Sequence, residues 1–217
     1  MSDGDFLIDC INLELEIKPQ KGYHLSENEK SVKNDLWRCK LPGMTADEAL
    51  ERLLKSFRQY YDVKREDVLP PFSAEAEFHS CEEGYFLVKK AVISEAESNE
   101  YVFFYAAESL SAGDVKRLDG IAWEEGMRRI NPHRDHKNSD ISVFFLAENI
   151  SADALKEVKK LKRYKSYNHS FHGYTHYKTV AFDTTTGALA YNRLGSEKKK
   201  LFGIMIKELN NNQEGRK

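Results

Sequence analysis

The sequence predicts one domain of the α/β or α+β class, a single mixed sheet of about six to seven strands with helices packed on its faces. Three observations predict it. Apolar residues recur at helical spacing in some segments and alternate with polar residues in others. The chain has 217 residues, 41% of them hydrophobic, which suits one domain with an extension. A strand followed by a serine-capped helix occurs twice in succession, as in parallel sheets.

The N-terminal part differs in composition from the rest. Residues 1–43 are predicted as an extension packed on or beside a single domain that spans residues 44–217. Within residues 11–17, isoleucine and leucine alternate with polar residues, which predicts one strand. Residues 18–42 are polar and aperiodic, so the boundary is expected there.

The domain is expected to begin with a helix and a three-strand meander. Thr45 and Glu48 have the spacing of a capping box, and apolar residues at helical spacing extend the helix to about residue 61. The meander strands are predicted at residues 72–78, 85–93 and 101–107, with the second turn at residues 97–100.

A repeated strand-helix unit follows. Residues 102–112 closely match residues 143–152; each copy contains a buried strand, a glutamate and a serine that caps a helix. Duplication and chance similarity both remain open. If the two strands are parallel and joined by a helix over residues 112–129, Glu108 and Glu148 lie at their carboxyl ends, where open α/β sheets bind ligands.

The C-terminal third completes the sheet. A helix is predicted over residues 152–163, followed by a segment rich in aromatic residues and histidine. Residues 179–183 and 188–192 are expected to form a hairpin around a turn that contains Gly187. A last helix is expected from Ser196 onward.

The distribution of charge, the length of the apolar runs and the cysteines indicate which partners and which compartment to expect. The net charge is −2, but residues 1–100 hold 13 basic and 21 acidic residues, against 20 and 14 in residues 101–217. A basic face is therefore compatible with the sequence. The longest apolar run, residues 101–107, is far shorter than the roughly 20 residues of a membrane-spanning helix. Without a secretory signal and with three widely spaced cysteines, the protein is expected to be cytoplasmic, with no membrane partner.

The basic run around residues 155–165 is a candidate nucleic-acid surface. Its cations can pair with phosphates and the tyrosines after it can stack on bases. The residues concerned are Lys159, Lys160, Lys162, Arg163 and Lys165. The alternative is a solvated helix face, because apolar residues recur in the same segment at helical spacing.

A histidine cluster is the candidate metal site. His169, His172 and His176 are spaced so that imidazoles could lie near one another, and imidazole is a common metal ligand. The zinc-hydrolase pattern His-Glu-x-x-His is missing, so histidines that bond to backbone or water are the alternative.

Two hypotheses of function follow. The first is a binding or interaction module with an unknown ligand near Glu108, Glu148, Tyr167 and Tyr174, for which nucleic acid is a candidate. The second is a metal-dependent hydrolase or nuclease that uses the histidines and strand-end carboxylates. The sequence contains no phosphate-loop, dinucleotide-binding or nucleophile-elbow motif, so no cofactor is expected and no partner is identified.

Overall fold

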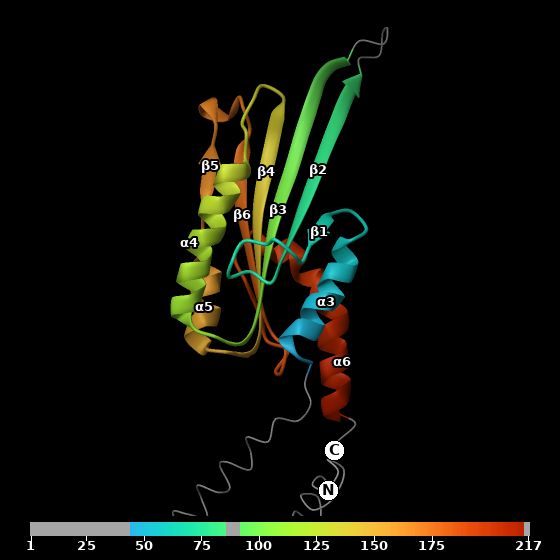
Figure 1. Ribbon diagram of the computed structural model, residues 1–217, viewed down its shortest axis with the longest axis vertical. Coiled ribbons are helices and arrows are strands. Elements are labelled where there is room, and N and C mark those ends of the chain that lie inside the picture. Colours follow the sequence, from blue (N-terminus) through green and yellow to red (C-terminus); the bar gives the residue numbers. More distant parts are fainter. Residues whose placement is uncertain (1–43, 86–91, 215–217) are drawn as a thin grey trace, which may run out of the picture. The chain divides into compact units, whose positions relative to one another are not determined.

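A computed structural model describes residues 44–85 and 92–214 of the chain (Figure 1). The predicted N-terminal extension and its strand lie outside these residues. The elements in chain order are α3 (Ala46–Phe57), β1 (Asp62–Lys64), β2 (Ala74–Tyr85), β3 (Val92–Leu110), α4 (Ala112–Arg129), β4 (His136–Ile150), α5 (Ala152–Lys160), β5 (Tyr164–Ser166), the 3-10 helix η1 (Asn168–Ser170), β6 (Tyr174–Asp183), β7 (Leu189–Tyr191), the 3-10 helix η2 (Gly195–Phe202) and α6 (Gly203–Glu214).

All the described strands belong to one mixed sheet. The strand order is β1-β2-β3-β4-β6-β5, and β7 pairs with β6. Strands β1, β2 and β3 are antiparallel neighbours, whereas β4 is parallel to β3 and β6 is parallel to β4. The sheet has seven strands, and helices pack on it, so the predicted fold class is confirmed.

The meander exists, but its strands were predicted wrongly. Residues 97–100, expected to form a turn, lie inside β3, where Glu97 is opposite Cys81 and Glu100 is opposite Phe78. Strands β2 and β3 therefore make one long hairpin, and the meander consists of β1, β2 and β3. The prediction failed because the polar residues of β3 have partners distant in sequence: Asn99, for example, is buried and its amide contacts Ser139.

The repeated strand-helix units lie side by side. Strand β3 leads into α4 and the parallel strand β4 leads into α5, with Ala107 opposite Ala147. The hydroxyl groups of Ser111 and Ser151 accept hydrogen bonds from backbone amides three residues further on, as predicted for the two caps. Both helices pack on the same face of the sheet (Figure 1).

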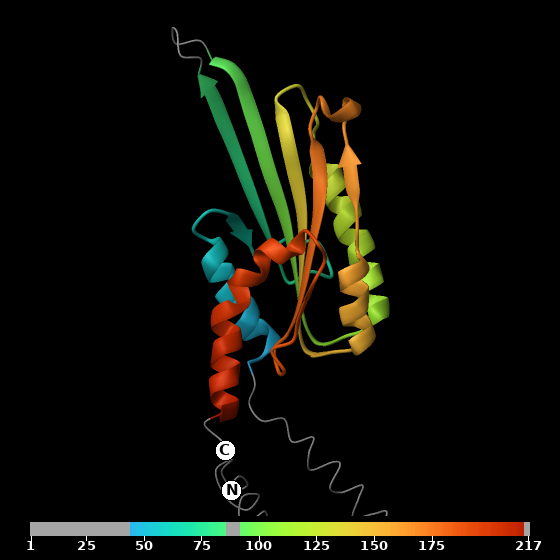
Figure 2. The same cartoon turned by 180° about the vertical axis from the view of Figure 1, so that it is seen from behind.

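Each face of the sheet has its own apolar core. On one face, α4 and α5 cover Phe103, Phe145 and Tyr177. On the other, α3, η2 and α6 cover Phe104, Phe144 and other residues (Figure 2). None of the described helices combines the length and the apolarity that crossing a membrane requires.

Candidate functional site

A pocket with a volume of about 430 Å³ lies where the end of α5 meets β5, β6 and the segment after β7. Its lining is strongly basic. The cationic lining residues are Lys159, Lys160, Lys162, Arg163 and Arg193. The others are Leu161, Tyr164, His176, Tyr177, Asn192 and Leu194, so within the described part of the chain no aspartate or glutamate lines the pocket. Such a lining favours an anionic ligand.

Asn192 holds the walls of the pocket together. Its buried side chain accepts hydrogen bonds from the amides of Thr179 (3.2 Å) and Gly195 (2.7 Å) and donates to the carbonyls of Leu161 (3.1 Å) and Tyr177 (2.8 Å). These four bonds join the end of α5, strand β6 and the start of η2. Because they use both donors and both acceptor positions, one side chain fixes three elements.

The end of α5 is compatible with a bound anion. A helix C-terminus carries a partial negative charge on its free carbonyl groups. Here the hydroxyl of Thr179 donates to the carbonyl of Val158 at 3.3 Å, and Asn192 donates to that of Leu161. Two of the carbonyl groups that would repel an anion are therefore already bonded.

The basic residues predicted from the sequence have unequal surroundings. Lys159, Lys160, Lys162 and Lys165 are all exposed, and the ammonium of Lys160 also lies 3.9 Å from the carboxylate of Glu157. Lys165 is on β5 and is not part of the pocket lining. Three lysines of the predicted set therefore face the pocket with their ammonium groups accessible to solvent.

Arg163 is held by a buried acid. Its guanidinium donates three hydrogen bonds to the carboxylate of Asp119, the shortest being 2.6 Å, and lies over the ring of Trp123 at 5.4 Å. The hydrogen bonds that Arg163 donates to Asp119 raise the pKa of Arg163. Arg163 thus forms a fixed wall of the pocket, whereas the side chains of Lys159 and Lys162 are exposed.

Aromatic rings border the pocket on β5 and β6. The ring of Tyr164, which is 55% exposed, lies 6.4 Å from that of Tyr174 and 5.8 Å from that of His176. Tyr167 was predicted to join this group and does not: its hydroxyl contacts Thr175 at 2.8 Å, and its ring packs on the core that α4 and α5 cover. The aromatic border therefore comes from the exposed Tyr164 and the half-buried Tyr174.

The structure separates the predicted carboxylates from these tyrosines. Asp140 on β4 is opposite His176, and Ala147 on β4 is opposite Asp183 at the far end of β6. Glu148, eight residues beyond Asp140, is therefore about 26 Å further along the strand. Glu108 lies at the same end as Glu148, so these two glutamates and Tyr174 form no common ligand site.

The three histidines of the predicted metal site occupy different surroundings. His169 is exposed in η1, and Nε2 of His172 lies 3.4 Å from the side-chain amide nitrogen of Asn168. His176 lines the basic pocket. Within residues 44–85 and 92–214, no group of three or more histidine, cysteine, aspartate or glutamate residues has an arrangement that could hold a metal ion.

Comparison with protein families identifies the domain that contains the pocket. Residues 45–204 match the family described as "Domain of unknown function (DUF8052)". The chain belongs to the DUF8052 family. Neither the curated proteins nor the solved structures contain a match. The matched segment includes every residue that lines the pocket, so the pocket is a feature of the DUF8052 domain itself.

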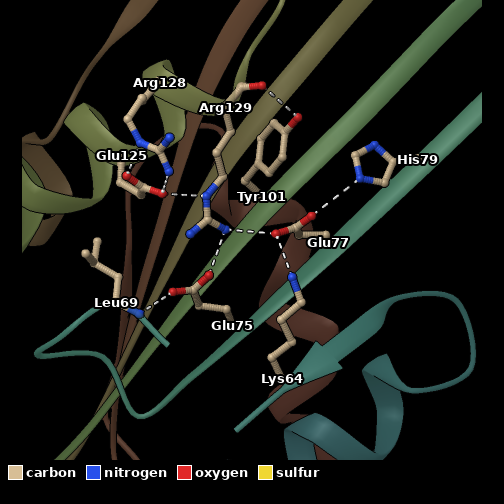
Figure 3. Close-up of polar contacts among 9 residues, drawn as sticks. All are labelled: Lys64, Leu69, Glu75, Glu77, His79, Tyr101, Glu125, Arg128 and Arg129. Carbon is tan, nitrogen blue, oxygen red and sulfur yellow. Dashed lines mark hydrogen bonds and ion pairs between the residues drawn. The ribbon is translucent and has the colours of Figure 1, made fainter. Parts of the chain in front are cut away.

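A second polar cluster of the DUF8052 domain fastens α4 to the sheet (Figure 3). Arg129, near the end of α4, contacts the carboxylates of Glu75 (2.7 Å), Glu77 (2.9 Å) and Glu125 (2.8 Å), and its guanidinium lies 5.2 Å from the ring centre of Phe103. Glu75 is buried and also accepts a hydrogen bond from a backbone amide. The cluster is a structural link between α4 and β2.

The stability of the DUF8052 domain is expected to depend on Glu125 at acidic pH. The hydrogen bond from Arg128 is the main cause that lowers the pKa of Glu125 from 4.5 to about 2. Because the pKa of Glu125 is lower in the folded than in the unfolded state, its ionised carboxylate stabilises the fold at pH values above 4.5. This contribution is lost as the pH falls from 4.5 toward 2. In urea titrations at several pH values, the unfolding free energy of Glu125→Gln should fall less between pH 4.5 and 2 than that of the wild type. Glu124→Gln, at the exposed neighbouring residue, should show the wild-type dependence on pH. Parallel curves for wild type and Glu125→Gln would contradict the assignment.

A third cluster lies on the face of the DUF8052 sheet that is opposite to α4. It is close to the pocket, because His176, which lines the pocket, lies 3.9 Å from Asp140 of this cluster. Lys198 contacts the buried carboxylate of Glu100 at 2.7 Å, and Lys178 contacts both Asp140 and Glu197 at 2.5 Å. Although burial acts against the charged form, Glu100 and Asp140 raise the pKa of Lys178. The second carboxylate oxygen of Asp140, Oδ1, is buried and has no hydrogen-bond partner among the described residues.

Proposed function

We propose that this DUF8052 protein is a binding module for single-stranded nucleic acid, with phosphates held in the basic pocket. The observation that carries the proposal is the lining, which has five cationic side chains and, among the described residues, no carboxylate. Cations gathered in one concavity attract phosphate groups from a distance and pair with them on contact. The net charge of the chain is −2, so the basic lining of the pocket does not follow from an excess of basic residues over the whole protein.

The aromatic border favours single strands over duplex. The ring of Tyr164 is more than half exposed and lies next to the lysines of the pocket. A base can stack on an exposed ring only when it is not already enclosed in a double helix, and each such contact contributes about 1–3 kcal/mol. A backbone held in the pocket would bring neighbouring bases to Tyr164 and Tyr174.

The alternative of a metal-dependent hydrolase has no support among the described residues. The histidines predicted for it are in three different environments, and the pocket provides no carboxylate ligand. The proposal is therefore a module that binds without performing chemistry at the pocket.

Fluorescence anisotropy of a labelled oligonucleotide tests the proposal. We expect single-stranded binding to weaken between about 50 and about 200 mM salt, because phosphate contacts release counterions. Lys159→Ala combined with Lys162→Ala should weaken binding roughly tenfold and reduce the salt slope by about 1.4, or 0.7 for each lost phosphate contact.

The matched control is Lys55→Ala combined with Lys207→Ala. These lysines are exposed on α3 and α6, outside the pocket, and their removal changes the net charge by the same amount. The control should bind like the wild type. Absence of binding at low salt, or equal weakening in both double variants, would overturn the proposal.

A further inference from the structure

Resting on the proposed function, we infer that the pocket receives the phosphate monoester at an end of the strand and that His176 distinguishes this group from an internal phosphodiester. His176 lines the pocket together with the lysines, and its Nδ1 lies 3.9 Å from the carboxylate of Asp140. The inference depends on three features: the number of cations, the geometry of the Asp140–His176 pair and the size of the pocket.

The cations outnumber the charge of an internal phosphate. A phosphodiester carries one negative charge, whereas a monoester carries about 1.5 to 2 at neutral pH and offers three strong acceptor oxygens. Three lysines and Arg193 line a single pocket in addition to Arg163, whose charge is compensated by Asp119. A dianionic group satisfies this lining better than a diester does, because each added charge interacts with all the surrounding cations.

The geometry of His176 leaves one interaction incomplete. Its Nδ1 lies 3.9 Å from Oδ1 of Asp140, which is beyond hydrogen-bond distance, and that oxygen is buried without a partner among the described residues. The other oxygen of Asp140 is bound by Lys178 at 2.5 Å. A small movement of the imidazole toward Asp140 would provide the missing hydrogen bond.

A terminal phosphate favours that movement. With Nδ1 directed at Asp140, Nε2 can contact a phosphate oxygen, so one ring bridges the carboxylate and the phosphate. The other groups facing the ring are Tyr164 on β5 and Tyr174 and Lys178 on β6. The nearby Glu197 is paired with Lys178, so its charge is compensated.

The size of the pocket is that of a small-molecule site. Its volume of about 430 Å³ falls within the usual range of about 300–1,000 Å³ for ligand pockets. It can therefore enclose the end of a strand, with Tyr164 at its border beside the terminal base.

The test compares oligonucleotides of one sequence that carry a 5′-phosphate, a 3′-phosphate or hydroxyl groups at both ends. Wild type should bind one phosphorylated end about tenfold more tightly than the hydroxyl-ended strand, as expected for a charge-assisted hydrogen bond. His176→Gln should reduce that ratio to about one, and Asp140→Asn should reduce it in part. The matched control is His169→Gln, an exposed histidine outside the pocket, which should keep the ratio.

The outcomes separate this inference from the proposed function. Equal affinity of wild type for phosphorylated and hydroxyl-ended strands, with lysine-dependent binding retained, overturns the end-reading role and leaves the nucleic-acid module standing. Absence of binding to every strand overturns both. Competition by a 5′-mononucleotide supports a monoester site, whereas tighter binding of a phosphotyrosine peptide than of the phosphorylated strand overturns the inference.

Discussion

Arg129→Ala is expected to lower the free energy of unfolding by about 3 kcal/mol, because it leaves the buried acid Glu75 without its cation. Arg129 contacts three carboxylates, and that of Glu75 is only 4% exposed (Figure 3). Removing the guanidinium deprives Glu75 of its ion pair and weakens the attachment of α4 to β2. The packing of Arg129 over Phe103 is lost as well.

Arg128→Ala provides the control for this prediction. Arg128 is the preceding residue, carries the same charge and also contacts Glu125 at 2.7 Å, but its side chain is 73% exposed. Its replacement should lower the unfolding free energy far less than Arg129→Ala does, because exposed ion pairs are screened by water and salt. Urea denaturation of both variants measures the difference. Equal losses of unfolding free energy in the two variants would contradict the prediction, because they would show that burial of Glu75 does not determine the cost.

Asn192→Ala is expected to cost about 3 kcal/mol or more and to weaken ligand binding at the same time. The substitution removes four hydrogen bonds and leaves buried backbone groups of β6, η2 and the end of α5 unpaired, each at a cost of about 1–3 kcal/mol before water or local adjustment offsets it. Because these groups form the pocket walls, the positions of Lys162 and Arg193 should change with them.

A milder variant keeps this prediction testable if the alanine variant fails to fold. Asn192→Asp retains an acceptor oxygen but loses both donated bonds and introduces a negative charge into a basic pocket. It should weaken oligonucleotide binding by more than its loss of thermal stability accounts for. Asn149→Ala, an exposed site at the end of β4, should change neither property. Unchanged binding by Asn192→Asp would contradict the role of Asn192 in the pocket.

Local sequence signals predicted the starts of α3, α4 and α5 because the determinants of a helix end are close together in the chain. The capping box formed by Thr45 and Glu48 marks the start of α3, and Ser111 and Ser151 mark those of α4 and α5. The prediction that Ser196 caps the last helix was wrong: Ser196 lies inside the 3-10 helix η2, which has no side-chain cap, and its hydroxyl donates to the carbonyl of Arg193. Strand β3 was missed as a single element because its polar residues resemble a turn. Glu100, for example, is stabilised inside the strand by Lys198, 98 residues away.

The candidate site was predicted only in part for a similar reason. The basic run that ends α5 was visible in the sequence and does contribute to the pocket. The partners that give each residue its role were not visible: Arg163 pairs with Asp119, 44 residues earlier. Asn192 was missed because a single asparagine at the end of a predicted hairpin strand carries no chemical signal, and its four bonds depend on the complete fold.

The two faces of the sheet also become complete at different times during synthesis. The face covered by α4 and α5 is built from consecutive crossovers, whereas Phe104, Phe144 and Phe182 on the other face are covered partly by Phe202 near the end of η2. Domains are made from the N-terminus at about 5–20 residues per second. A nascent chain that has not yet released η2 from the ribosome therefore holds an aromatic surface that, among the described helices, only α3 can cover. Ribosome-associated chaperones are expected to engage this surface at that stage.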